Sequence, residues 1–245
     1  MGNNICSSTV LTAKSLSKSF DSNVALKSLD LQVSSGEIVC LLGSNGAGKT
    51  TTINLFMGFL SPDSGEAIVN GMVVANDPAA ARNYLGYVDE IVTLYPSLSG
   101  RENLDFFHAL SKQPSLSDEE CNRILSSLDF PMKALNSRLS TYSKGMRQKL
   151  GLAIAVAKNA KAILLDEPLS GLDPKAANDL VAVLKSLAKN GTAILLSTHD
   201  IFRAKSVGNR IGIMTGGQLV DIVDPNTLSS QDLEAVYLKH IAEGQ

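Results

Sequence analysis

The amino-acid sequence predicts an α/β fold built on a parallel sheet, and three observations lead to that prediction. The apolar run 38–42 precedes a glycine-rich loop and a short segment with helical character. Two further apolar runs, 162–165 and 192–197, flank a helix expected over residues 174–190. A strand–helix–strand unit of this kind implies parallel strands. Between these parts, residues 101–158 have a helical pattern, which indicates an inserted helical lobe.

The first section of the chain is expected to be β-rich. Leu29, Leu31 and Val33 alternate with polar residues, which is typical of a half-buried strand. The turn 34–36 then leads into the buried strand 38–42. Residues 50–58 predict a short helix that a glycine ends. We therefore expect a parallel core with antiparallel β-hairpins at its front.

The helical lobe and the second half of the core follow in order. The apolar residues expected to form two helical faces in the lobe are Leu104, Phe107 and Leu110 on one face and Ile124, Leu125 and Leu128 on the other. Pro174 suits the first turn of the next helix, and Asn190-Gly191 suits its end. We expect one domain over residues 1–245, divided into a core of 9–90 and 159–225, a helical lobe of 91–158 and a helical tail of 226–245.

Composition limits the partners that the chain is expected to have. The formal net charge is −2 and the isoelectric point is near 5.9, so no overall charge favours nucleic acid or anionic lipid, and we expect no nucleic-acid partner. The three cysteines Cys6, Cys40 and Cys121 lack metal-ligand spacing and are expected to be reduced packing residues. The start of the chain shows no export or lipid signal, and the apolar stretch 150–157 is shorter than the roughly 18 residues that span a bilayer. A role at a membrane would therefore need a partner.

The strongest chemical signal is the P-loop pattern Gly43-Ser44-Asn45-Gly46-Ala47-Gly48-Lys49-Thr50, placed between a strand and a helix as the motif requires. Its backbone N–H groups and the helix N-terminus suit phosphate, Lys49 would reach the terminal phosphates of ATP, and Thr50 would offer a hydroxyl to Mg²⁺. The residues expected to bind nucleotide are Gly43, Ser44, Asn45, Gly46, Ala47, Gly48, Lys49, Thr50 and Thr51. The alternative is a plain glycine-rich turn. The pattern predicts a P-loop NTPase core of the RecA-like kind.

A second signal is the apolar strand 162–165 followed by Asp166-Glu167-Pro168. Because successive residues of a strand alternate in direction, the two carboxylates are expected to point in different directions. Asp166 is then the expected Mg²⁺ ligand, and Glu167 is placed to act as a general base on the attacking water. The alternative is a solvated strand end.

From about Leu11 to Leu238 the chain resembles the ATP-binding domains of ABC transporters. The resemblance rests on the order of the motifs: the P-loop, the signature-like 142–146, Asp166-Glu167, the D-loop 170–173 and a switch histidine at His199. It implies that Phe20 stacks on adenine, that His199 contacts the γ-phosphate, and that Ser143, Gly145 and Asp173 serve ATP held by a second protomer in a head-to-tail dimer. Considered alone, Ser143 would be an ordinary helix cap, Phe20 a core aromatic and His199 a structural histidine.

The chain departs from the family pattern at two places. Glu90 stands where the family commonly has glutamine, and an ionised carboxylate can only accept hydrogen bonds. We expect Glu90 to contact Mg²⁺ or the attacking water; the alternative is a solvated loop charge. In the signature-like segment, Lys144 replaces the usual glycine and Met146 the usual glutamine, so a cation lies near the expected partner phosphate.

The resemblance implies an ATP-hydrolysing motor that pairs with a second copy of itself or a homologous ATPase and drives a separate membrane permease from the cytoplasmic face. Segments 142–150 and 233–238 look like those of exporter ATPases and subfamily A transporters. One alternative is a non-transport ABC-type ATPase acting on a soluble or ribonucleoprotein partner. A DNA-repair ATPase would need a long coiled coil between Lys49 and Asp166, for which 117 positions (166 − 49) leave no room. A small-molecule kinase would leave 170–173 and His199 without a role.

Overall fold

The computed structural model describes residues 8–111 and 113–243 of the chain. Cys6 and the start of the chain lie outside the described residues. The elements in chain order are β1 (Thr9–Phe20), β2 (Asn23–Ser34), β3 (Ile38–Leu42), α1 (Lys49–Phe56), β4 (Ser64–Val69), β5 (Met72–Val73), α2 (Pro78–Arg82), β6 (Leu85–Val88), α3 (Gly100–Ala109), α4 (Asp118–Ser127), the 3₁₀ turns η1 (Met132–Ala134) and η2 (Leu139–Thr141), α5 (Lys144–Ala157), β7 (Ala162–Leu165), α6 (Pro174–Lys189), β8 (Ala193–Thr198), α7 (Ile201–Val207), β9 (Arg210–Thr215), β10 (Gln218–Val223) and α8 (Ser230–Glu243).

The larger sheet has the strand order β10-β9-β3-β8-β7-β6, and all its neighbouring pairs are parallel except β10 with β9. The three expected core strands are β3, β7 and β8, which confirms the predicted parallel sheet. The expected helix between the last two is α6, and it begins at Pro174. Because the strands are parallel, their carboxyl ends and the loops after them meet at one edge, where ligands of such sheets bind.

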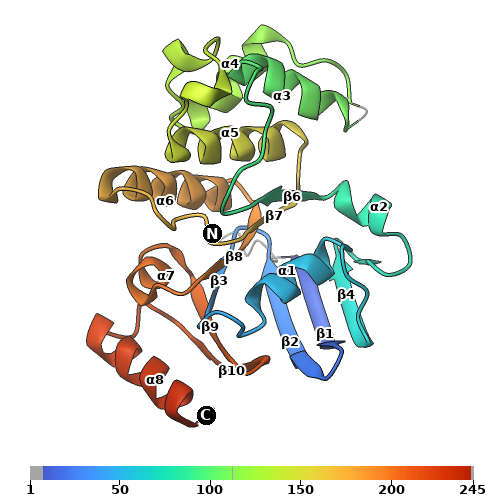
Figure 1. Ribbon diagram of the computed structural model, residues 1–245, viewed down its shortest axis with the longest axis vertical. Helices are drawn as coiled ribbons and strands as arrows, with labels where there is room; N and C mark the ends of the chain where they lie inside the picture. The colour runs from blue at the N-terminus through green and yellow to red at the C-terminus, as the bar shows by residue number, and fades with distance from the viewer. Residues whose placement is uncertain (1–7, 112, 244–245) are drawn as a thin grey trace, which may run out of the picture.

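The smaller sheet is antiparallel, with the order β2-β1-β4-β5. Leu29, Leu31 and Val33 are buried in it and alternate with exposed residues, as predicted. Helix α1 contributes Ile53 and Phe56 to the apolar cluster that this sheet shares with one face of the larger sheet. The P-loop helix is therefore held from both sides. Figure 1 shows β1, β2 and β4 beside α1, with β3, β9 and β10 of the larger sheet to their left.

The helices α3, α4 and α5 form a lobe above the larger sheet in Figure 1. Capping boxes at Ser99 and Ser117 fix the starts of α3 and α4. The apolar face of α4 is buried as predicted, but Leu110 is not part of the α3 face, because α3 ends at Ala109 and 64% of Leu110 is exposed. The first helix of the lobe thus begins close to the start of the predicted helical pattern, and its apolar face lacks Leu110.

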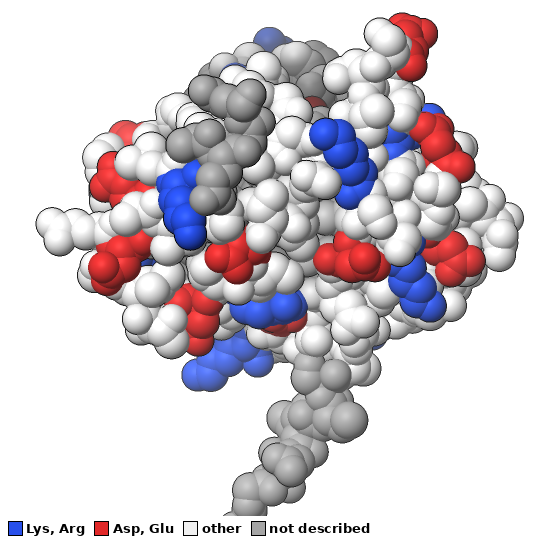
Figure 2. Space-filling view, turned by 90° about the horizontal axis from the view of Figure 1, so that it is seen from below, with Lys and Arg blue, Asp and Glu red and all other residues white. Residues whose placement is uncertain are grey.

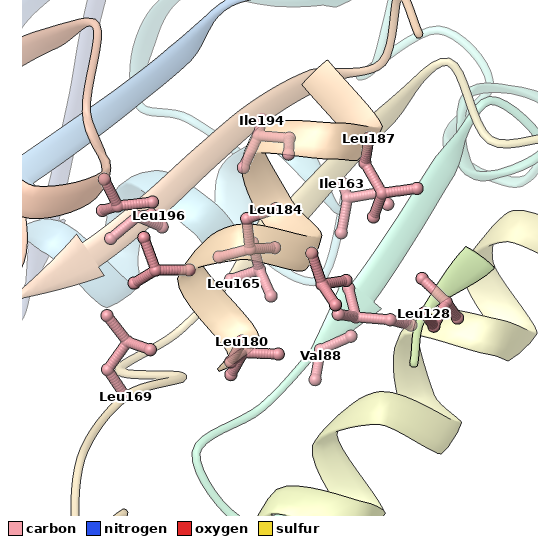
Figure 3. Packing of buried hydrophobic residues seen from close by; sticks show 14 of the residues in the cluster. Val88, Leu128, Ile163, Leu165, Leu169, Leu180, Leu184, Leu187, Ile194 and Leu196 are labelled. Atoms are coloured by element: carbon pink, nitrogen blue, oxygen red, sulfur yellow. The ribbon is translucent and has the colours of Figure 1, made fainter. Parts of the chain in front are cut away.

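The main core lies between α6 and the strands of the larger sheet. Figure 3 shows Leu180, Leu184 and Leu187 of α6 turned toward the apolar side chains of β7 and β8. The cluster continues into the helical lobe through Leu128, so the lobe and the sheet share one apolar core. Cys40 and Cys121 are buried free thiols, as predicted for packing residues. Burial raises the pKa of the Cys40 thiol, so it stays protonated.

The surface at the lower end of the molecule carries both signs of charge. Figure 2 shows lysine and arginine side chains interspersed with aspartate and glutamate on this face. In the part of the chain that the structure describes, no helix combines the length and the apolar character that a membrane span requires.

Candidate nucleotide site

The glycine-rich loop follows β3 and turns directly into α1. Gly48 caps α1 with a φ of 103°, a left-handed conformation that other residues adopt only with strain. A Cβ on Gly48 would also lie 2.7 Å from the carbonyl oxygen of Ala25. The backbone N–H of Gly43 donates to the carbonyl of Thr198 at 3.2 Å, which ties the loop to the end of β8. These constraints explain why glycine is needed here.

Lys49 is buried at the start of α1, with 6% of its surface exposed. Its Nζ donates to the carbonyl oxygens of Gly43 at 2.7 Å and Ser44 at 3.0 Å, and it lies 3.8 Å from Oε1 of Glu167. Burial lowers the pKa of Lys49, and the nearby carboxylates of Glu167 and Asp166 act in the opposite direction. The ammonium group thus connects the glycine-rich loop with the acidic loop after β7.

A cleft of about 470 Å³ opens over this loop. Its lining includes the predicted nucleotide residues Phe20, Asn45, Gly46, Ala47, Gly48, Lys49, Thr50 and Thr51 and the predicted acidic residues Glu90, Asp166 and Glu167. Sequence reasoning missed Asn23, Ala25 and Asp89, which also line it. Phe20 is 42% exposed at the end of β1 and opens onto this cleft, so it is not a core aromatic. The cleft brings residues that are distant in the sequence, from Phe20 to Glu167, to one edge of the sheet.

Asp166 and Glu167 diverge for a reason other than the one the sequence suggested. β7 ends at Leu165, so strand alternation does not extend to them. Instead Glu167 has a φ of 47°, which turns its backbone sharply after Asp166. Ser197 of β8 joins the two: its hydroxyl donates to Asp166 Oδ1 and accepts from the backbone N–H of Glu167 at 3.0 Å. Sequence reasoning missed Ser197, which holds Asp166 and Glu167 in place. The sequence did offer an indication, since Ser197 is a polar residue near the end of an apolar strand.

His199 lies beyond β8, and its Nδ1 is 3.0 Å from Oε1 of Glu167. The imidazole is mostly exposed, with 57% of its side-chain surface accessible. It does not line the cleft itself and reaches it through Glu167. The carboxylate of Glu167 therefore stands between the ammonium of Lys49 and the imidazole of His199.

The oxygen groups in the cleft fit a divalent cation held together with phosphate. Thr50 offers a hydroxyl and Asp166 a largely buried carboxylate, which are the ligand types that Mg²⁺ prefers. The described residues contain no cluster of three or more His, Cys, Asp or Glu able to hold a metal by themselves.

Glu90 follows β6, and its carboxylate is held by two groups from other loops. Oε1 accepts from the hydroxyl of Ser170 at 2.8 Å and lies 3.5 Å from Nζ of Lys144. The hydrogen bond from Ser170, and then the charge of Lys144, lower the pKa of Glu90. Glu90 is thus not a loop charge that is merely solvated, although 45% of its side chain is exposed.

Of the predicted nucleotide residues, Gly43 and Ser44 belong to the glycine-rich loop but do not line the cleft, and three others lie on other elements. Ser143 caps α5 by accepting from the N–H of Met146 at 3.3 Å, and Asp173 caps α6 by accepting from Ala176 at 2.9 Å. Gly145 faces α6, since a Cβ on it would lie 3.4 Å from Cβ of Ala176. Within one chain none of the three lines the cleft.

A glycine-rich loop between a buried strand and a helix, with two carboxylates at the same edge of a parallel sheet, defines a P-loop nucleoside triphosphatase. Residues 26–170 match the ABC transporter family. The chain belongs to this family, as an ATP-binding domain that hydrolyses ATP.

Relatives in bacteria and eukaryotes are similar over most of this chain. An uncharacterised ABC transporter ATP-binding protein of Bacillus subtilis, YdbJ, is 35% identical over 86% of this chain and 68% of its own length. The linearmycin resistance ATP-binding protein LnrL of the same bacterium is 29% identical over 91% of this chain and 71% of its own. ABC transporter A family member 1 of Dictyostelium discoideum is 37% identical over 79% of this chain and 22% of its own length. The predicted resemblance to subfamily A is confirmed.

The cassette MJ0796, a bacterial ABC transporter cassette solved as a dimer, has a TM-score of 0.78 and 25% identity over 88% of this chain and 98% of its own. A second structure of that cassette, in a post-hydrolysis state with ADP and Pi, gives the same values. These likenesses agree with the P-loop fold described above.

Proposed function

We propose that this chain is the motor subunit of a transporter, which dimerises around two ATP molecules and drives a separate membrane permease. The observation that supports the proposal is that three residues expected to bind nucleotide lie outside the nucleotide cleft of their own chain. Ser143, Gly145 and Asp173 are far enough from the cleft not to line it, and Ser143 and Asp173 are exposed. A hydroxyl and free N–H groups at the start of a 14-residue helix suit phosphate. A nucleotide that these residues bind would therefore be presented by another copy or by a homologous ATPase.

The cleft supplies the groups that ATP hydrolysis needs. The loop 43–51 would hold the phosphates, and Phe20 would stack on the adenine. Mg²⁺ held by Thr50 and Asp166 would neutralise charge on the phosphates. Glu167 would accept the proton of the attacking water, and His199 would contact both Glu167 and the γ-phosphate. Glu90, which lines the cleft, is a further candidate contact of the metal or the water.

An exposed apolar surface on the helical lobe supports the permease as partner. Ile91 is 70% exposed in the loop after β6, and Tyr95 and Phe106 are 47% and 40% exposed. The rings of Tyr95 and Phe106 pack edge to face with centroids 4.9 Å apart. A cavity of about 230 Å³ lies beside them between β6 and α5. Since this surface adjoins Glu90, a partner seated there would sense the state of the nucleotide cleft.

We propose export as the direction of transport. The proposal is supported by the similarity to LnrL, which is named a linearmycin resistance ATP-binding protein. We propose that this chain likewise serves an exporter and lies at the cytoplasmic face of the membrane through its permease.

The test has two parts. Glu167→Gln protein with saturating ATP and Mg²⁺ should elute from a sizing column as a dimer, and a monomer would contradict the ATP sandwich. The wild-type chain should copurify with a membrane protein, and Ile91→Lys with Tyr95→Lys should lose it while keeping ATP binding. Copurification with a soluble protein or a ribonucleoprotein instead would favour the non-transport alternative.

A further inference from the structure

The two positions at which this chain departs from the family pattern are in contact. Oε1 of Glu90 lies 3.5 Å from Nζ of Lys144. The same oxygen accepts the hydroxyl of Ser170 at 2.8 Å. A Cβ on Gly171 would lie 3.4 Å from Nζ of Lys144, so the ammonium group lies against the turn 170–171. One carboxylate thus joins the loop after β6, the turn after β7 and the start of α5.

Lys144 occupies an electrostatically unfavourable position. It is the first residue of α5, immediately after the cap Ser143. The N-terminus of a helix carries partial positive charge, which repels a cation and attracts an anion. Glu90 offsets this repulsion by placing a carboxylate beside the same helix end. Lys144 therefore needs a compensating anion in this conformation.

The backbone that carries Glu90 is attached to the same helix. Nε2 of Gln148, which is buried in α5, donates to the carbonyl oxygens of Asp89 and Glu90, both at 3.1 Å. The N–H of Glu90 is capped by Oδ1 of Asp89 at 2.7 Å. These bonds attach the backbone of Glu90 to α5, the helix that begins with Lys144. The contact to Ser170, by contrast, crosses to the loop after β7.

Stability alone does not account for the pair. Glu90 and Lys144 have 45% and 34% of their side chains exposed, and exposed ion pairs contribute little to folding. A triphosphate carries far more negative charge than one carboxylate and would compete for the same ammonium.

We propose that Glu90 is a positioning residue that holds the Lys144 ammonium at the start of α5 until the triphosphate bound to a second copy takes it over. This inference rests on the proposed ATP sandwich. On this proposal the affinity for ATP depends on Glu90 through Lys144. The Lys144 ammonium must leave the Glu90 carboxylate before it can bind the phosphate.

The test is a double-mutant cycle read as KM for ATP and kcat. Lys144→Gln should raise KM about tenfold, and Glu90→Gln should lower KM several-fold. Glu90→Gln added to Lys144→Gln should leave KM unchanged. Asp118→Asn is the matched control, since Asp118 pairs with Arg101 at 2.6 Å in the same lobe, far from the cleft lining. It should leave both constants at wild-type values.

The charge-exchanged variant Glu90→Lys with Lys144→Glu separates this role from a structural ion pair. It restores an opposite-charge pair but removes the cation from α5, so KM should stay at least as high as in Lys144→Gln. A wild-type KM in this variant, or equal effects of Glu90→Gln in both backgrounds, would overturn the proposal. If Glu167→Gln forms the ATP-bound dimer and the effects of Glu90→Gln and Lys144→Gln on KM are additive, the proposed role of Glu90 is wrong while the proposed dimer is supported. If Glu167→Gln forms no dimer, the proposed function is contradicted, and the inference that rests on it is contradicted as well. Thermal unfolding of each variant identifies any that do not fold.

Discussion

The imidazole of His199 and the carboxylate of Glu167 lie 3.0 Å apart, measured from Nδ1 to Oε1. They come from loops after neighbouring strands, β8 and β7, which the parallel register places side by side. The oxygen that faces His199 is also 3.8 Å from the Lys49 ammonium. A carboxylate placed between two such groups is held at the cleft, where we propose that it accepts a proton from the attacking water.

Glu167→Gln is expected to retain ATP binding and to reduce ATP turnover at least about a hundredfold, because an amide cannot accept the proton of water. Asp166, Lys49 and Thr50 remain to hold the nucleotide. Steady-state phosphate release and equilibrium binding of labelled ATP measure the two properties separately. Near-normal turnover would exclude Glu167 as the base.

His199→Ala is expected to lower turnover at least about tenfold, because it removes the imidazole that lies beside the Glu167 carboxylate. Single-turnover measurements with saturating ATP test the prediction. His240→Ala is the control, since His240 lies near Asp221, at 3.3 Å, away from the cleft lining. Equal rates for both variants would leave His199 without a catalytic role.

Ser197→Ala is expected to impair both stability and turnover. The change removes the hydrogen bonds to Asp166 and to the N–H of Glu167 in a fully buried position, which costs about 1–3 kcal/mol. Displacement of Glu167 should lower turnover by about tenfold to a hundredfold. Urea unfolding and ATPase assays measure these effects. Ser127→Ala removes a hydroxyl bonded within α4, at 2.7 Å to Ile124, and should leave turnover unchanged.

Glu90→Gln is expected to lower the Mg²⁺ concentration needed for half-maximal ATPase rate. The substitution removes a negative charge from a cleft that already contains Asp166 and Glu167. Mg²⁺ titrations of both forms at fixed ATP give the answer. Superimposable curves would show that Glu90 does not act on the metal. The same titrations in the Lys144→Gln background separate an effect on Mg²⁺ from one that depends on Lys144.

Leu184→Ala is expected to reduce the free energy of unfolding by about 2–5 kcal/mol, because Leu184 is fully buried between α6 and the sheet (Figure 3). Leu238→Ala on α8 is the control: Leu238 is 56% exposed, so its truncation should change little. Chemical denaturation monitored by circular dichroism compares them. A similar loss in both would contradict the location of the core.

The sequence predicted the parallel sheet, the position of the glycine-rich loop and the acidic pair well, because each depends on local patterns. It could not predict contacts between distant segments. The bonds of Ser197 to Asp166 and Glu167 need the β7–β8 pairing, and the contact of Glu90 with Lys144 needs the helical lobe to be folded onto the core. The prediction that alternation along a strand separates Asp166 from Glu167 was wrong, because β7 ends at Leu165, before both residues, and Glu167 has a left-handed backbone.

The roles of Ser143, Gly145 and Asp173 stay predictions, since one chain shows them only as helix starts. Residues that act on a neighbouring copy have no partner to identify them within a single chain. For Ser143 and Asp173, the local physics of capping is sufficient to explain the residue type.

The left-handed backbone at Glu167 has a consequence for how this protein can change over time. A glutamate with a φ of 47° costs about 1 kcal/mol or more, and glycine or asparagine would adopt that turn more readily. Selection for easier folding would therefore favour replacing Glu167, the side chain that we propose accepts a proton. Only selection for turnover would keep glutamate there. A selection for folding yield alone, carried out without ATP, should accumulate glycine or asparagine at position 167.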